Sequence, residues 1–123
     1  MTGSRKKVLY VDDDERTLHV VAKYLIANGY QVFTSTSPFV APILEEKHPD
    51  LVILDIEMPL LTGDKIADIL VNQGYSRSTP ILFFSGEPED KISRMASRVP
   101  GARFVTKQSG LDALLGEIRT ILP

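Results

Sequence analysis

The chain has 123 residues, a formal net charge of −2 and no cysteine, and 43% of its residues are hydrophobic. This length fits one domain with a single core, and the near-balanced charge argues against nucleic acid as a direct partner. The lack of cysteine excludes disulfides, thiolate nucleophiles and cysteine-ligated metals. No apolar run approaches the roughly 20 residues that cross a bilayer. We therefore expect a cytoplasmic protein without membrane insertion.

Residues 1–7 are polar and small, and we predict them as a disordered N-terminal segment before a single domain over residues 8–122. The first strand is expected at Val8–Val11, which is followed by three aspartates. A helix is expected from Glu15, because apolar residues recur there at helical spacing. We expect Asp14 to cap this helix rather than to bind a ligand.

The alternating segment Gln31–Ser35 predicts a second strand. The next helix is expected to start near Val40 or Ala41, because Pro42 is then harmless in the first turn, whereas an earlier start would lose a backbone hydrogen bond there. The apolar run Leu51–Leu54 predicts a third strand that is buried on both faces.

The second half of the chain repeats this alternation of strands and helices. We expect a helix around Ile66–Gly74, a strand at Pro80–Phe84, a helix from Pro88 to about Val99, a strand at Ala102–Thr106 and a helix at Leu111–Leu122. Strands that alternate with helices predict an α/β fold of the (βα)5 type, with a doubly wound parallel sheet covered on both faces. The expected strand order is 2-1-3-4-5, which is flavodoxin-like.

Polar residues follow the strands at the edge where ligands bind in such sheets. Asp12 and Asp13 follow the first strand, Asp55 follows the third, Ser85 the fourth and Lys107 the fifth. Carboxylates that converge there repel each other and need a positive partner, for which two candidates remain: Lys107 lying across Asp55, and a divalent cation, of which Mg²⁺ best fits oxygen ligands. Such a set is equipped to transfer a phosphoryl group to Asp55.

Several motifs in this order resemble the receiver domain of two-component response regulators, over about Lys7 to Leu122. They are VLYVDDD, LVILDIEMPLLTG, FFSG and FVTK. The resemblance implies these site residues: for Mg²⁺, Asp12, Asp13, Asp55 and the backbone carbonyl of Glu57; for catalysis, Asp55, Ser85 and Lys107; and for a conformational switch, Ser85 and Phe104. It also implies that Asp55 is phosphorylated by a sensor histidine kinase or a histidine phosphotransfer protein.

The sequence departs from this family at several positions, and at one of them the switch aromatic, Phe104, lacks the hydroxyl through which a tyrosine would gain a hydrogen bond. Gln108 stands where the family usually has a proline in a cis peptide, and because a non-proline cis bond costs roughly 3–4 kcal/mol, we predict either a trans bond with a shifted loop or a strained cis bond. Gly86 stands where alanine is usual and adds backbone freedom to a loop that must move.

Glu57 and Glu87 flank the path of water to the phosphoryl group in this family, and we hypothesise that they tune the lifetime of the phosphorylated state.

The leading hypothesis is a phosphorylatable signalling switch rather than an enzyme that turns over a separate substrate. Phosphorylation is then expected to alter the face formed by the last two helices and the strand between them, where a downstream protein binds and where Lys91, Arg94 and Arg98 are candidates for docking an acidic partner. Two alternatives stay open: a degenerate receiver that docks partners without phosphorylation, and a phosphatase with Asp55 as nucleophile. Homodimer formation also stays open, as does the choice between a stand-alone regulator and the receiver of a longer protein.

Overall fold

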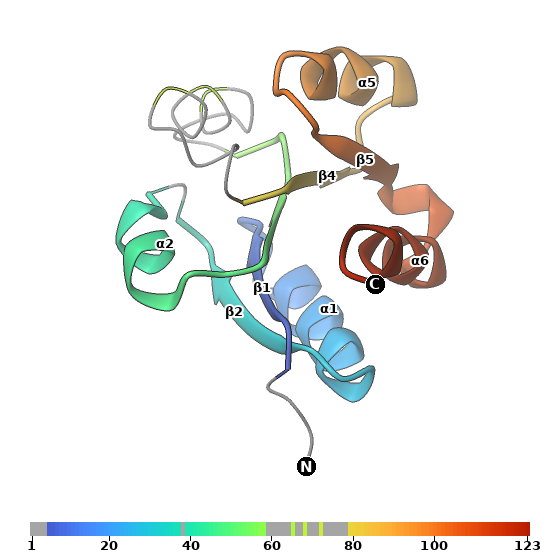
Figure 1. The fold of residues 1–123 in the computed structure, drawn as a ribbon. Coiled ribbons are helices and arrows are strands. Elements are labelled where there is room, and N and C mark those ends of the chain that lie inside the picture. The colour runs from blue at the N-terminus through green and yellow to red at the C-terminus, as the bar shows by residue number, and fades with distance from the viewer. Residues whose placement is uncertain (1–4, 38, 59–64, 66–67, 69–71, 73–78) are drawn as a thin grey trace.

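The computed structural model describes residues 5–37, 39–58, 65, 68, 72 and 79–123. In these residues, parallel strands form one five-stranded sheet in the order β2-β1-β3-β4-β5, which confirms the predicted fold and strand order (Figure 1). The strands are β1 (Lys7–Val11), β2 (Gln31–Ser35), β3 (Leu51–Leu54), β4 (Ile81–Ser85) and β5 (Arg103–Thr106).

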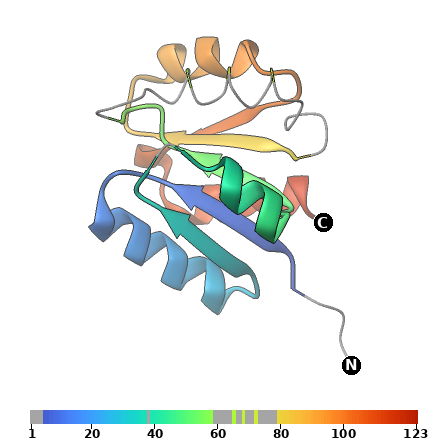
Figure 2. The same ribbon diagram turned by 90° about the vertical axis from the view of Figure 1, so that its left-hand side faces the viewer.

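Helices cover both faces of the sheet, with α1 and α6 on one face and α2 and α5 on the other (Figure 1, Figure 2). They are α1 (Glu15–Ala27), α2 (Ala41–Lys47), α5 (Glu89–Ser97) and α6 (Leu111–Ile121), with a short 3-10 helix, η1 (Lys107–Ser109), after β5. The predicted helix around Ile66–Gly74 rests on apolar residues that lie outside the described part of the chain. Among the described helices, none is both long and apolar enough to span a membrane.

Two apolar clusters, one on each face of the sheet, form the core. Successive side chains of a strand point to opposite faces, so each central strand contributes to both clusters. In β1, Leu9 and Val11 pack on the α2 and α5 side, while Val8 and Tyr10 pack on the α1 and α6 side. Every residue of β3 is buried, as its unbroken apolar run predicted. The carboxyl ends of the central strands are therefore anchored in a packed interior.

Local sequence signals explain how the first two helices begin. The Asp14 side chain accepts a hydrogen bond from the Arg16 N–H at 3.0 Å, which confirms it as the cap of α1. Helix α2 begins with Pro42 in its first turn, as predicted, and is followed by His48 with a left-handed φ of 49°. The Asp14 cap fixes the turn that joins β1 to α1, directly beside Asp12.

A few predicted boundaries differ from the structure. Strand β1 begins at Lys7, which pairs with Gln31, so residue 7 is not part of a disordered segment as predicted for residues 1–7. Strand β4 begins after Pro80, because proline has no N–H to donate to a neighbouring strand. At its other end, β4 extends one residue further than predicted and includes Ser85. The elements α5, β5 and α6 are each slightly shorter than expected.

Candidate functional site

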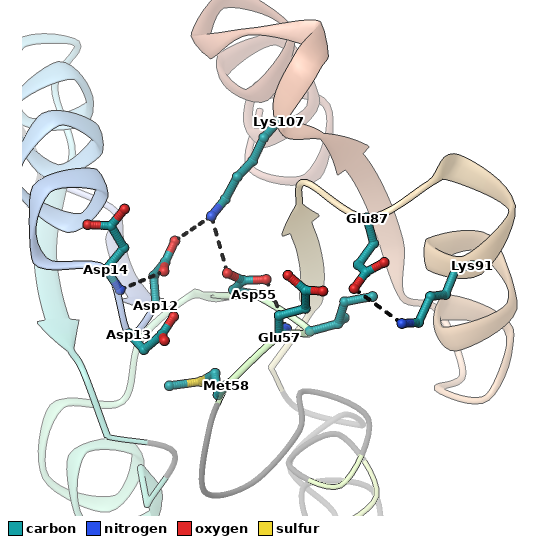
Figure 3. A pocket seen from close by; sticks show the side chains of 10 residues that line it. Asp12, Asp13, Asp14, Asp55, Glu57, Met58, Glu87, Lys91 and Lys107 are labelled. Atoms are coloured by element: carbon teal, nitrogen blue, oxygen red, sulfur yellow. Dashed lines mark hydrogen bonds and ion pairs between the residues drawn. The ribbon is translucent and has the colours of Figure 1, made fainter.

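The carboxyl ends of β1, β3 and β5 border an open pocket of about 600 Å³ (Figure 3). Its lining includes Asp12, Asp13, Asp55, Glu57, Glu87 and Lys107. Parallel strands bring their carboxyl ends to the same edge of a sheet, so side chains that are 95 positions apart in the chain make contact here. The pocket confirms the predicted convergence of the three aspartates and the lysine.

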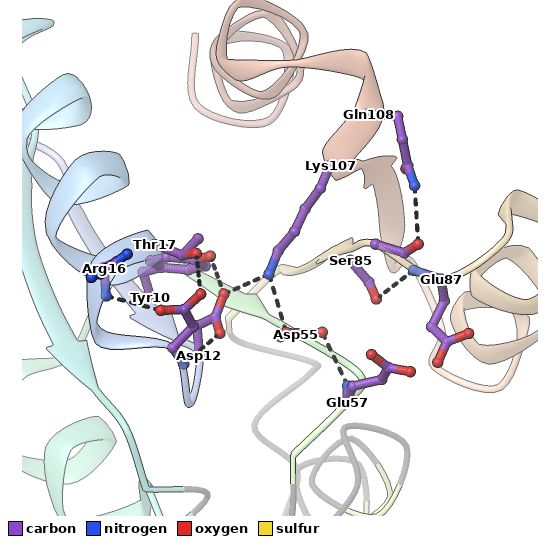
Figure 4. Close-up of polar contacts among 12 residues, drawn as sticks. Tyr10, Asp12, Arg16, Thr17, Asp55, Glu57, Ser85, Glu87, Lys107 and Gln108 are labelled. Carbon is purple, nitrogen blue, oxygen red and sulfur yellow. Dashed lines mark hydrogen bonds and ion pairs between the residues drawn. The ribbon is translucent and has the colours of Figure 1, made fainter.

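Asp12 is completely buried at the end of β1. Its Oδ2 accepts hydrogen bonds from Lys107 Nζ at 2.7 Å and from the Tyr10 hydroxyl at 2.6 Å, and its Oδ1 accepts one from the Asp14 N–H at 3.0 Å (Figure 4). Burial, together with the hydrogen bond to Asp12, raises the pKa of the Tyr10 hydroxyl, which remains a donor. These three donors hold the Asp12 carboxylate in one orientation.

Asp55 follows β3 and is only 6% exposed. Its Oδ2 accepts a hydrogen bond from Lys107 Nζ at 3.2 Å, and its Oδ1 accepts one from the Glu57 N–H at 3.0 Å. Burial is the largest cause of a rise in the pKa of Asp55 from 3.8 to about 6; Lys107 and the Ser85 hydroxyl oppose this rise, and the charge of Asp12 adds to it. The ionised Asp55 carboxylate is therefore destabilised here and gains from any added positive charge.

Lys107 follows β5 and bridges two carboxylates (Figure 4). Burial lowers the pKa of its ammonium group, but the hydrogen bond to Asp12 and the charge of Asp55 outweigh burial, so the pKa is raised. The prediction that Lys107 lies across Asp55 is confirmed, whereas its shorter contact with Asp12 was not predicted. Lys107 thus keeps a positive charge between the two buried carboxylates.

The same carboxylates form a set that fits a divalent cation. One oxygen from each of Asp12, Asp13 and Asp55 lies within 4.8 Å of the others, and Asp13 is exposed while the other two are buried. Lys107 offsets only part of the charge of three carboxylates. Because the donors are all hard oxygens, they suit Mg²⁺ rather than zinc. The backbone carbonyl of Glu57 stays a predicted further ligand.

Two glutamates line the pocket beside these carboxylates (Figure 3). Glu57 is exposed, whereas the Glu87 side chain is 12% exposed and pairs with Lys91 at 3.2 Å. On α5, which also carries Lys91, Arg94 pairs with Asp90 at 3.6 Å. Lys91 and Arg94 are exposed as predicted, but their charges are partly neutralised by these carboxylates, which weakens the expected basic surface on α5.

The two predicted switch residues lie on neighbouring strands. Ser85 is buried at the end of β4, where its Oγ accepts a hydrogen bond from the Glu87 N–H at 3.2 Å. Phe104 is half-buried on β5, opposite Phe83, and packs against the core on the α5 side. Their positions suit a switch that begins beside Asp55, and their role stays a prediction.

The loop after β5 resolves one of the predicted alternatives. The Lys107–Gln108 peptide bond is trans, and no cis bond occurs among the described residues. The chain turns directly into η1, where the Thr106 and Ser109 hydroxyls share a hydrogen bond at 2.7 Å. Gln108 Nε2 donates to the Gly86 carbonyl at 3.1 Å, so the loop after β5 is joined to the loop after β4 (Figure 4).

The contact between Tyr10 and Asp12 and the contact between Gln108 and Gly86 were not predicted from the sequence. Tyr10 lies within an apolar strand, so nothing in the local sequence marks its hydroxyl as part of the site. The signal that could have found it is that residues i and i+2 of a strand share a face, which places Tyr10 beside Asp12. The other contact joins residues 22 positions apart and has no local signal.

A family model described as "Response regulator receiver domain" matches residues 8–119. The chain belongs to this family. The receiver is 27% identical over 119 residues to Protein PilG of Pseudomonas aeruginosa, a match that covers 95% of this chain and 87% of PilG. It is 30% identical over 113 residues to the transcriptional regulatory protein KdpE of Mycobacterium tuberculosis, covering 91% of this chain but 49% of KdpE.

Among solved structures, the receiver is similar to the chemotaxis protein CheY4 of Vibrio cholerae. The TM-score is 0.86 at 25% sequence identity, and the match covers 96% of the receiver and 99% of the CheY4 chain. The receiver thus matches PilG and CheY4 over most of their length, whereas it spans about half of KdpE.

Proposed function

We propose that this receiver is a signalling switch that accepts a phosphoryl group on Asp55 in a Mg²⁺-dependent reaction. The phosphoryl donor is the phosphohistidine of a sensor histidine kinase or of a histidine phosphotransfer protein. The proposal rests on one observation: the buried Asp55 carboxylate contacts Lys107 at 3.2 Å and lies within reach of a cation shared with Asp12 and Asp13. Membership of the receiver family supports the same chemistry.

The reaction is the attack of an Asp55 carboxylate oxygen on the phosphorus of phosphohistidine. An O–P bond forms and the N–P bond breaks; the leaving imidazole keeps the bonding electron pair, and solvent supplies its proton. A divalent cation held by Asp12, Asp13 and Asp55 would offset charge on the phosphoryl oxygens. The Lys107 ammonium is already in place to donate to one of those oxygens.

After transfer, the new phosphoryl oxygens attract hydrogen-bond donors. The Ser85 hydroxyl, which accepts from the Glu87 N–H before transfer, turns to donate to the phosphoryl group and draws the loop after β4 with it. Phe104 follows, and the face formed by α5, β5 and α6 changes shape. A downstream protein in the cytoplasm binds that face in one state more tightly than in the other.

The phosphoryl group is then lost by hydrolysis, so the chain turns over its own phosphorylated state rather than a separate substrate. Glu57 and Glu87 set the rate of this loss through the charge they place at the pocket opening. A second copy of the chain is an alternative partner for the same face.

Intact-mass analysis after incubation with acetyl phosphate and Mg²⁺ tests the proposal. Wild type and Asp50→Asn, a matched change at the amino-terminal end of β3, are expected to gain one phosphoryl adduct. Asp55→Asn and wild type in excess chelator are expected to gain none. A wild-type protein that binds Mg²⁺ but gains no adduct, or an adduct that persists in Asp55→Asn, would overturn the proposal.

The hydrogen bond between Gln108 and Gly86 favours a second candidate, a docking module that works without phosphorylation. This bond ties down the loop after β4, which is the loop that must move in a switch. A docking module binds its partner equally well before and after phosphorylation. Comparing the affinity of a bound partner protein for the unphosphorylated and the phosphorylated receiver separates the switch from the docking module.

A further inference from the structure

Tyr10 is a core tyrosine whose hydroxyl reaches the candidate site. Its side chain is 0% exposed and belongs to the apolar cluster on the α1 and α6 side. The Phe84 ring lies beside it, with 6.4 Å between ring centroids. Residues i and i+2 of a strand share a face, so the hydroxyl extends along β1 to Asp12 (Figure 4).

The donors on Asp12 are unevenly divided between its two oxygens. The Tyr10 hydroxyl at 2.6 Å and Lys107 Nζ at 2.7 Å both donate to Oδ2. The Asp14 N–H, at 3.0 Å, donates to Oδ1. A carboxylate oxygen has two lone pairs, so both lone pairs of Oδ2 are engaged and Oδ1 keeps one for a further ligand.

We propose that Tyr10 is a positioning residue for the divalent cation, because its hydroxyl holds Asp12 with Oδ1 available to the pocket. This inference rests on the proposed function, and it concerns a residue that neither coordinates the cation nor touches the phosphoryl group. Residues that hydrogen-bond a metal ligand typically change metal affinity by about 10- to 100-fold when they are removed.

The two donors on Oδ2 respond differently to an arriving cation. Lys107 is positive and is repelled by a second positive charge, so its hold on Asp12 weakens as the cation binds. The Tyr10 hydroxyl is neutral and restrains the carboxylate in both states. Because the Tyr10 side chain is completely buried in the apolar cluster, water does not replace its hydroxyl when it is removed.

A tyrosine that only packs in the core would give a different result from one that positions Asp12. A buried tyrosine hydroxyl usually has a hydrogen-bond partner, whatever the partner does. If the bond to Asp12 only satisfies the hydroxyl, its loss changes stability and leaves cation affinity unchanged. Cation affinity is therefore the measurement that separates the two roles.

The test compares Tyr10→Phe with Tyr30→Phe. Tyr30 is 7% exposed and belongs to the same apolar cluster, but it precedes β2 at the opposite edge of the sheet. Mg²⁺ affinity is measured by NMR from the backbone amides of Asp13 and Glu57. We expect wild-type affinity in Tyr30→Phe and a dissociation constant at least about 10-fold higher in Tyr10→Phe. Phosphoryl acceptance by Tyr10→Phe is expected to need more Mg²⁺ and to recover at saturation.

An affinity in Tyr10→Phe within about twofold of wild type, or tighter, would overturn the inference, since losing a positioning bond must weaken binding. Absence of Mg²⁺ binding in wild type would instead refute the proposed function. Should Tyr10→Phe fail to fold, the wild-type protein still tests whether the bond to Asp12 persists once Mg²⁺ is bound, as the inference requires. Its Tyr10 hydroxyl proton is expected to exchange slowly with and without Mg²⁺, and rapid exchange in the Mg²⁺-saturated protein would show that the bond to Asp12 is lost.

Discussion

Replacing Asp55 with asparagine is expected to stabilise the cation-free protein. Folding raises the pKa of this carboxyl from 3.8 to about 6, chiefly through burial. A group whose pKa is raised by folding contributes stability that is complete below its unfolded pKa and is lost as the pH rises through its folded pKa. Above about pH 7 the ionised carboxylate therefore destabilises the fold, and Asp55→Asn removes that charge.

The size of the effect follows from the pKa of Asp55 in the two states. Each pKa unit corresponds to about 1.4 kcal/mol, so a rise from 3.8 to about 6 sets an upper limit of about 3 kcal/mol. The pocket is open to solvent, which screens part of the charge, so we expect Asp55→Asn to raise the free energy of unfolding by about 1–3 kcal/mol at about pH 7.5. At about pH 4.5, where the folded carboxyl is already protonated, less than half of this gain remains.

Urea unfolding followed by circular dichroism, in chelator at both pH values, measures this gain. Asp90→Asn is a suitable control, because it removes a highly exposed carboxylate that makes only a 3.6 Å pair with Arg94 on α5. We expect a change of less than about 0.5 kcal/mol for the control. A neutral or destabilising effect of Asp55→Asn at about pH 7.5, or a gain that does not grow with pH, would refute the reasoning from burial.

The remaining predictions concern the cation, the lysine and the loop contact. Mg²⁺ at ten times its dissociation constant is expected to raise the free energy of unfolding of wild type by about 1.4 kcal/mol, and Asp13→Asn should lose most of this gain in the same urea assay. Lys107→Ala leaves the buried Asp12 carboxylate without its ammonium partner and is expected to destabilise the cation-free protein by about 2–3 kcal/mol at about pH 7.5. Gln108→Ala removes an exposed hydrogen bond to Gly86, so we expect a stability change below about 0.5 kcal/mol but faster amide hydrogen exchange in the loop after β4.

Each of these predictions has a contrary result. Equal stabilisation of wild type and Asp13→Asn by Mg²⁺ would remove Asp13 from the ligand set. A Lys107→Ala protein as stable as wild type would mean that the buried carboxylates do not depend on the ammonium. Unchanged hydrogen exchange in Gln108→Ala would mean that the loop after β4 is held by other contacts.

Local patterns were enough to predict where most strands and helices lie. The run Leu51–Leu54 is apolar throughout because both faces of β3 are covered, and the position of Pro42 limited where α2 starts. The rule that parallel strands share a carboxyl edge then predicted that Asp55 and Lys107 lie close together. These inferences succeeded because they depend on neighbours in the chain and on a general property of parallel sheets.

Strand boundaries were less predictable because pairing partners are distant in the chain. Ser85 belongs to β4 because Thr106 pairs with it from β5, and Lys7 belongs to β1 because Gln31 pairs with it from β2. Neither residue has an apolar side chain that marks it as part of a strand.

Only the tertiary structure decided which hydrogen-bond donor pairs with which carboxylate oxygen. Lys107 contacts Asp12 more closely than Asp55, and the Tyr10 hydroxyl shares the same Asp12 oxygen. Residue order along the chain predicts which side chains meet at an edge, but the partner of each donor depends on distances of a few tenths of an ångström. Burial also sets the unusual pKa of Asp55, because the cost of ionising a carboxylate depends on everything packed around it rather than on its neighbours in sequence.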